Sequence, residues 1–244
     1  MSSLNLSSFA PLFGLPPSSS EIEAFLSTLT PPSSSSSSLS NGKPSLDLVP
    51  EIKAYPDAVY HNYYAFGLSL FFDPTKNNGL ESVDIFNPSP FPKPPKPGRK
   101  PEPTYAAPPR LTMDFPTDTL VLPPLKQGGE TKSISRPRIF SLDAETTGRQ
   151  FVSCLGEPSR KGSGGWTGVW LEWSPVELVS TASSQPFPKD MGVESETVKV
   201  GIMLELRDPG AQEKVSDDAK KKGMGGVWER AAGWSWASVK VFKP

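Results

Sequence analysis

The feature of this chain that most constrains its fold is a set of short blocks that recur in the same order in its two halves. Within each pair of blocks, the apolar and aromatic residues keep their register. One match alone has little weight, but collinear matches along the whole chain indicate duplication of one structural unit. The blocks at 13–15, 25–29, 59–63, 67–74 and 82–88 match those at 140–142, 151–155, 169–173, 201–209 and 238–244.

Each copy combines one helical pattern with several strand patterns. Residues 22–29 and 151–155 place apolar side chains on one helical face, each after a pair typical of a capping box. The remaining blocks alternate apolar and polar residues with a period of two, as half-buried strands do. We therefore predict an α+β fold, in which two tandem copies of a short helix plus a three-stranded antiparallel sheet pack together with Pro/Ser-rich loops. The capping pairs are Ser20 with Glu23 and Thr147 with Gln150.

Proline and serine set the predicted domain boundaries. The chain holds 29 prolines, well above the usual share, and segments rich in proline and serine rarely form a packed core. Inside the connection between the copies, 119–122 has the pattern of a short edge strand. The predicted parts are a first repeat at 1–88 with a disordered serine-rich loop at 33–50, a proline-rich basic linker at 89–133, and a second repeat at 134–244 with loop insertions at 175–196 and 210–226.

Charge and residue usage argue against several classes of protein. The net charge is -1, whereas nucleic-acid binders usually carry a basic excess. Cys154 is the only cysteine and His61 the only histidine, which excludes an intrachain disulfide and makes a four-ligand zinc site implausible. The longest apolar stretch, near 65–72, is too short to cross a bilayer, and 1–20 lacks the pattern of a signal peptide. We expect no cofactor, no metal, no nucleic acid and no integral membrane association, and a location in the cytoplasm or nucleus.

Candidate catalytic residues are few. A Cys–His pair would need Cys154 and His61. The matching positions of the other copy hold Thr28 and Leu171, which cannot perform that chemistry. We therefore predict that the protein is not an enzyme and has no catalytic residue. The residues left open for an unrecognised enzyme are Glu172, His61, Arg160 and Lys161.

The glycine-rich stretch 156–165 has some features of a phosphate-binding loop. A Walker loop, however, places its lysine directly after the last glycine and at the start of a helix. Here Lys161 precedes the later glycines, and the stretch is expected to lead from a helix into a strand. The simpler interpretation is a flexible connection, with Arg160 and Lys161 left open as an anion contact.

Large aromatic residues are the feature that most favours a binding role. Tyrosine and tryptophan, which combine an apolar ring with a polar group, are over-represented in binding surfaces. They can equally fill a core between the repeats, and the sequence leaves both interpretations open. The predicted binding residues are Tyr60, Tyr63, Trp170, Trp173, Trp234 and Trp236.

Parts of the chain resemble known families. A helix ending at 155–158 and followed by strands with tryptophans resembles the BamE family of outer-membrane assembly lipoproteins, and tandem copies of such a unit resemble the β-lactamase-inhibitor-protein architecture. The stretch 67–73, followed by 80–85, is similar to a strand pair of the phagophore assembly factor family. These resemblances cover about half of the chain and imply a non-catalytic, protein-binding role. No functional residue of these families has a matching position in this sequence.

The predicted function is a non-enzymatic protein-interaction module. It would present an aromatic-rich sheet surface, or a groove between the repeats, to a protein partner. The alternative is a small-molecule or lipid-binding protein with an apolar pocket of several hundred cubic ångströms between the repeats. An unrecognised enzyme is the third class, and it would need polar groups that converge in one cleft.

Overall fold

The computed structural model describes residues 3–29, 48–89, 103–122, 130–163, 168–181, 196–208 and 228–244. Several predicted features fall wholly or largely outside these ranges. They are residues 33–47 of the serine-rich loop, residues 90–102 and 123–129 of the linker, residues 164–165 of the glycine-rich stretch, and residues 182–195 and 210–226 of the insertions.

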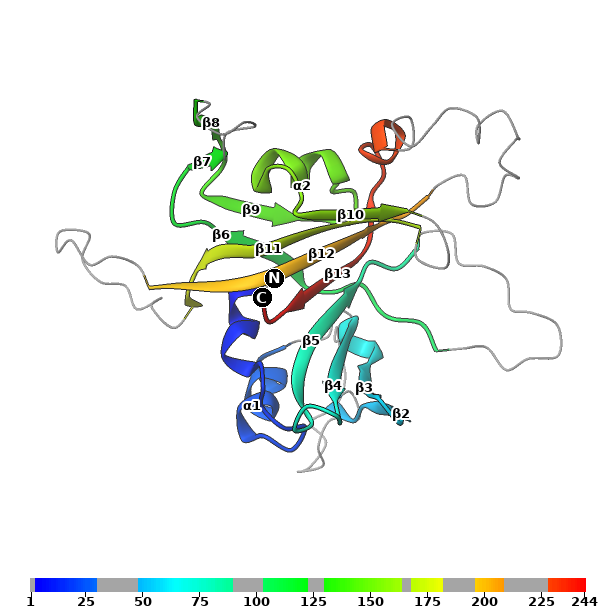
Figure 1. The fold of residues 1–244 in the computed structure, drawn as a ribbon. Coiled ribbons are helices and arrows are strands. Elements are labelled where there is room, and N and C mark those ends of the chain that lie inside the picture. The colour runs from blue at the N-terminus through cyan, green and yellow to red at the C-terminus, as the bar shows by residue number, and fades with distance from the viewer. Residues whose placement is uncertain are drawn as a thin grey trace, which may run out of the picture.

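One antiparallel sheet of eight strands dominates the molecule (Figure 1). Its strands are β2 Glu51–Tyr55, β3 Ala58–Tyr63, β4 Leu68–Asp73, β5 Gly79–Phe86, β10 Arg160–Ser163, β11 Val169–Val179, β12 Thr197–Leu206 and β13 Trp236–Phe242. Their order is β10-β11-β12-β13-β5-β4-β3-β2. Each half of the sheet therefore runs from an edge strand to the centre, where β5 and β13 pair.

The predicted fold class, two tandem units of one helix and three strands, is wrong. The two sets of strands merge into one sheet because β13 pairs with β5 from Phe86 opposite Ser238 to Ser82 opposite Phe242. The prediction also lacks both edge strands. Neither β2 nor β10 buries any residue, so neither shows the apolar alternation by which strands are recognised in a sequence.

Smaller elements accompany the large sheet. They are β1 Ser3–Asn5, η1 Leu6–Leu12, α1 Ser20–Thr28, η3 Tyr64–Phe66, β6 Arg110–Asp114, β7 Thr119–Leu122, β8 Lys132–Ser135, β9 Ile139–Leu142 and α2 Gly148–Leu155. Strands β1, β6 and β9 form a second sheet, in which β1 and β6 are parallel, and β7 pairs with β8. The strand expected at 119–122 is present as β7. The segment 89–133, predicted as a linker, thus contains β6 and β7.

Both helices lie where the sequence predicts them. Ser19, one residue before the expected cap, accepts hydrogen bonds from the first backbone N–H groups of α1. In α2, Thr147 and Gln150 form the predicted capping box. Gly156 then ends α2 with a φ of 81°, which favours glycine. No helix within the described ranges has the length and apolar character needed to cross a bilayer.

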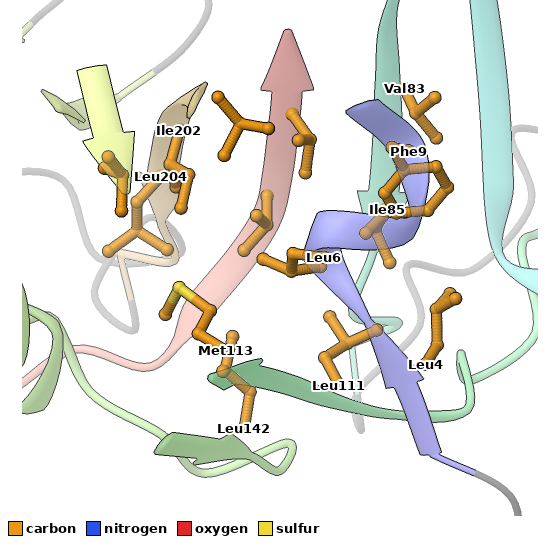
Figure 2. Packing of buried hydrophobic residues seen from close by; sticks show 14 of the residues in the cluster. Leu4, Leu6, Phe9, Val83, Ile85, Leu111, Met113, Leu142, Ile202 and Leu204 are labelled. Atoms are coloured by element: carbon orange, nitrogen blue, oxygen red, sulfur yellow. The ribbon is translucent and has the colours of Figure 1, made fainter. Parts of the chain in front are cut away.

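The core lies against one face of the large sheet, which we call the covered face. Leu6 and Phe9 of η1 and Met113 of β6 meet the apolar side chains of β5 and β12 there (Figure 2). Phe151 of α2 stacks on Trp173, with 6.4 Å between the ring centroids. Burying one such side chain stabilises the fold by about 2–3 kcal/mol, so this face holds the molecule together. The buried strand residues include Leu70, Val83, Ile85, Leu171, Ile202, Leu204, Val239 and Val241.

Candidate interaction surface

The side chains that alternate with the core residues point to the opposite side of the large sheet, which we call the open face. Because the strands are in register, these residues form three rows across the sheet. The charged row crosses all eight strands and lies between two rows that contain aromatic residues. The aromatic row is Tyr60, Phe71, Ser82 and Phe242; the charged row is Glu51, Asn62, Ser69, Asp84, Lys240, Met203, Glu172 and Arg160; the tryptophan row is Phe86, Ser238, Glu205, Trp170 and Gly162.

Asp84 in the charged row and Glu205 in the neighbouring tryptophan row are partly desolvated carboxylates. Lys240 Nζ lies 3.4 Å from Asp84 Oδ1, and the two side chains are only 31% and 16% exposed. Burial raises the pKa of Asp84 above its ordinary value, although Lys240 opposes the shift. Burial also raises the pKa of Glu205, and repulsion from Asp84 adds to the effect, while a 3.1 Å hydrogen bond from Ser238 opposes it. Lys240 thus pairs with Asp84, whereas Glu205 accepts its hydrogen bond from Ser238.

Trp170 is a rigid aromatic platform beside these charges. Its indole lies against Gly162, where an added Cβ would come within 2.4 Å of the ring, so only glycine fits there. The Arg160 guanidinium lies 5.9 Å from the centroid of the Trp170 ring and 3.5 Å from the Glu172 carboxylate. Trp170 therefore stays half-buried, with part of its ring available for contact.

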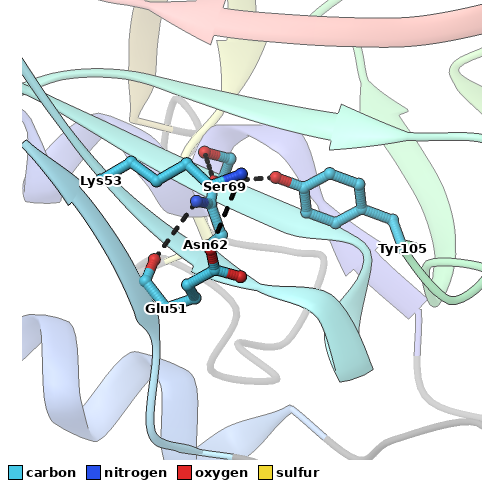
Figure 3. Close-up of polar contacts among 5 residues, drawn as sticks. All are labelled: Glu51, Lys53, Asn62, Ser69 and Tyr105. Carbon is cyan, nitrogen blue, oxygen red and sulfur yellow. Dashed lines mark hydrogen bonds and ion pairs between the residues drawn. The ribbon is translucent and has the colours of Figure 1, made fainter. Parts of the chain in front are cut away.

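On the β3–β5 side, the open face is covered by a tyrosine from the same chain (Figure 3). The ring of Tyr105 stacks on Phe86, with 4.0 Å between centroids. Its hydroxyl donates to Asn62 Oδ1 at 2.8 Å, and Ser69 Oγ donates to the same oxygen at 2.8 Å. Burial raises the pKa of Tyr105 to about 12, which is consistent with a shielded hydroxyl. Residues 103–109 thus cover part of one half of the open face.

The structure separates the predicted aromatic anchors into two groups. Only Tyr60 and Trp170 lie on the open face, and both are half-buried. Trp234 is half-buried on the other side of the sheet, where its carbonyl accepts a hydrogen bond from the first residue of α2. The remaining anchors, Tyr63, Trp173 and Trp236, are core residues with exposures of 6%, 3% and 2%.

Arg160 and Lys161, left open as an anion contact, do not converge. Neighbouring residues of a strand point to opposite faces. Arg160 belongs to the charged row of the open face. Lys161 lies on the other face, where its Nζ is 2.7 Å from Glu157 and 5.7 Å from the centroid of the Trp228 ring.

Several residues of the open face escape the sequence analysis. Asp84 and Lys240 occupy the same position in the matched blocks 82–88 and 238–244. The matched positions carry opposite charges, but the two residues become a pair only because β5 and β13 meet at the centre of the sheet. Met203 and Tyr105 lack any comparable signal, whereas the alternation of apolar and polar residues places Glu205 on the same face as Glu172.

The candidate catalytic residues lie in separate surroundings. His61 packs against Phe72, with 4.9 Å between ring centroids, and burial lowers its pKa. Cys154 is buried in α2, and burial raises the pKa of its thiol, which favours the unreactive protonated form. Among the residues whose positions are described, no group of three or more His, Cys, Asp and Glu could hold a metal ion.

A small pocket lies between α2 and one half of the sheet. Its volume is about 140 Å³, and it is lined by Val152, Leu171, Leu206 and Trp228 among others. Pockets for drug-sized ligands usually measure roughly 300–1,000 Å³. This one is smaller, and it does not lie at the β5–β13 junction where the two halves of the sheet meet.

Comparison with known proteins gives no match. No family model, curated protein or solved structure matches this chain. The resemblance to BamE-like, β-lactamase-inhibitor-protein-like and phagophore assembly factor proteins therefore stays a prediction.

Proposed function

We propose that this protein is a non-enzymatic interaction module that binds a protein partner across the open face of its large sheet. The observation that carries the proposal is the charged row lying between two rows that hold aromatic residues. Trp170 and Met203 offer rigid and adaptable apolar contact area, while Asp84 and Glu205 offer charge that gives orientation. Tryptophan and methionine are enriched in interfaces between proteins, and charges beside them contribute mainly to orientation and specificity.

Tyr105 indicates how this face accommodates a side chain. On the β3–β5 side, its ring stacks on an aromatic residue of the open face and its hydroxyl reaches a polar group of the charged row. The β10–β13 side offers a similar combination in Trp170 and Glu205, which are paired across neighbouring strands. A partner residue with a flat apolar part and a polar end would fit this second place.

The charges favour a basic anchor on the partner. On the open face, Lys240 pairs with Asp84 and the 70% exposed Arg160 pairs with Glu172, while Glu205 accepts a hydrogen bond from Ser238. A cationic group placed between Asp84 and Glu205 would relieve their repulsion. Arginine suits the site better than lysine, because its planar guanidinium can stack on an indole and pair with a carboxylate at the same time.

His61, Cys154 and the small pocket bear on the other functions considered. A non-enzymatic role is supported by the apolar surroundings of His61 and the protonated state expected for Cys154. A role in binding lipids or small molecules is less favoured, because the 140 Å³ pocket is small for such ligands. A location in the cytoplasm or nucleus, supported by the single cysteine, completes the proposal.

The test begins with the full chain as bait in an extract of the cells that express it. A captured protein is then purified, and its affinity is measured for the unchanged chain and for W170A, E205Q and R149E. We expect W170A and E205Q to weaken binding by about tenfold or more. Arg149 is an exposed residue of α2, away from the open face, so R149E should leave the affinity within about twofold.

The pH dependence of binding and the affinities of the two variants together test whether the open face binds the partner. Binding should weaken as the pH falls, because protonation of Asp84 and Glu205, whose pKa values are raised, removes the charge that a basic anchor needs. Unchanged affinity in both W170A and E205Q would exclude the open face as the binding surface. Thermal unfolding of each variant checks that a loss of binding is not a loss of fold.

A further inference from the structure

The outer edge of β2 has the properties of a strand-pairing site. Within the described part of the chain, β2 pairs with β3 and with no other strand. All five residues of β2 are exposed. Ile52 and Tyr55 are 57% and 56% exposed, and Val49, just before the strand, is 62% exposed. An exposed edge with apolar side chains is a template for pairing with another strand, and natural proteins usually protect such edges.

We infer that this edge pairs antiparallel with the same edge of a second copy of the chain, with Ile52 opposite Ile52 of the second copy. The two sheets would then continue into one another across a two-fold axis. Pairing of this kind uses the same surface on both copies, so it closes into a dimer and does not extend into a filament.

The backbone supports this register. Tyr55 and Ala58 flank a two-residue turn, so they exchange backbone hydrogen bonds, and the bonding residues of β2 then alternate. The N–H and C=O groups of Ile52 and Ala54 therefore point outward, away from β3. With Ile52 at the axis, the two copies of Ile52 bond to each other, and Ala54 N–H meets the carbonyl of Pro50 in the second copy. Pro50 has no N–H, which limits the length of the ladder.

The side chains are complementary in the same register. Glu51 falls opposite Lys53 of the second copy, and this pairing occurs twice because of the symmetry. In the isolated chain, the two residues lie 3.7 Å apart on one strand, are about half exposed, and both hydrogen-bond the Tyr64 side chain. In the dimer, each would exchange part of these contacts for the oppositely charged residue of the second copy. Val49 falls opposite Tyr55 of the second copy, so the exposed apolar residues also meet one another.

Neighbouring registers are excluded by charge. Because, within β2, only Ile52 and Ala54 point their backbone groups outward, the second strand can slide along the first only by steps that keep these two residues in bonding positions. A shift in one direction brings Lys53 opposite Lys53, and a shift in the other brings Glu51 opposite Glu51. Like charges directly opposite each other destabilise a strand pair, so of these three registers the one centred on Ile52 satisfies both the backbone and the charges.

Charge reversal on the full chain tests this pairing. Sedimentation equilibrium at low ionic strength measures the dimer dissociation constant for the unchanged chain and for E51K and K53E. Each single variant turns two attractive pairs into two repulsive ones, so we expect the constant to rise by about tenfold or more. The double variant E51K/K53E should recover the original constant, and an equimolar mixture of E51K and K53E should form a heterodimer. E177K, which reverses an exposed glutamate opposite Lys199 at the far side of the sheet, is the matched control.

Amide hydrogen exchange gives an independent readout. In the dimer, the amides of Ile52 and Ala54 are protected, and dilution should expose both. The pairing is refuted by a chain that stays monomeric at about 1 mM, or by a dimer that E51K, K53E and their mixture do not alter. Protection of Ile52 and Ala54 that does not change with concentration would mean that the edge pairs within its own chain, which also overturns the inference.

Discussion

Trp170 and Trp173 are three positions apart on β11, so they lie on opposite faces of the sheet, and their surroundings differ. Trp173 is 3% exposed, stacks on Phe151 and donates from Nε1 to the Gly156 carbonyl at 2.9 Å. Trp170 is half-buried and rests on Gly162 at the surface. The same residue type thus serves the fold on the covered face and is available for contact on the open face. Because the covered face supplies most of the stability, the open face can carry charges such as Asp84 and Glu205 that do not favour folding.

The two tryptophans give the largest expected difference between the faces. We expect W173A to lower the free energy of unfolding by about 3–5 kcal/mol, because it leaves a cavity and an unpaired carbonyl in the core. W170A should lower it by about 1 kcal/mol or less, because water replaces the lost contacts. Chemical denaturation of both variants measures the difference. Equal losses would remove the distinction between the faces.

The central ion pair tests how far the open face is desolvated. K240M removes the cation next to Asp84 and leaves a partly buried carboxylate unpaired. We expect the free energy of unfolding at neutral pH to fall by about 1–2 kcal/mol, less than for a fully buried pair. The double variant D84N/K240M should regain most of this loss, since no charge is then left unpaired. A loss in K240M that the double variant does not recover would indicate packing, not charge, as the cause.

The tyrosine that covers the β3–β5 side has a smaller expected effect. Y105F removes the hydrogen bond to Asn62 but keeps the stacking on Phe86. We expect a loss of about 1 kcal/mol in the free energy of unfolding. The control is Y55F, which changes a 56% exposed tyrosine on the edge strand. Urea denaturation distinguishes the two, and a loss in Y55F as large as that in Y105F would argue against a specific role for Tyr105.

Glu205 gives the smallest effect, with the opposite sign. Because its pKa in the folded state is raised, ionised Glu205 destabilises the fold at pH values above that pKa, and the penalty disappears as the pH falls below it. E205Q should therefore raise stability by roughly 0.5 kcal/mol at neutral pH and leave it unchanged in acid. Thermal unfolding across this pH range provides the measurement. If E205Q is more stable and also binds its partner less well, Glu205 serves binding at the expense of stability. Lower stability of E205Q at neutral pH would contradict the raised pKa of Glu205 in the folded state.

Local patterns in the sequence identify the helices and most central strands. The matched blocks 59–63 and 169–173 lie on β3 and β11, the strands next to the two edges. The capping box at Thr147 and Gln150 is correctly placed, because it depends on neighbouring residues. What the blocks cannot indicate is that β5 pairs with β13, since pairing between distant strands leaves no local pattern.

The sequence also does not show which aromatic residues lie on the open face. Residue type marks both Trp170 and Trp173 as binding anchors, and only the face of the strand separates them. Alternation along β11 places Leu171 and Trp173 on one side and Trp170 on the other, but which side is covered depends on where η1 and α2 pack. Tyr105 lies in the segment predicted as a linker, so its contact with Asn62 has no precursor in the sequence.

The claim that the β10–β13 side of the open face binds a protein partner is most directly tested by site-specific photo-cross-linking. A photoreactive amino acid is placed at Met203, at the centre of this surface, and in a second chain at Arg149 on α2. We expect cross-links from position 203 to the captured partner, close to an arginine or lysine of that partner, and none from position 149. Cross-links from position 149 alone, in a complex that forms normally, would contradict it.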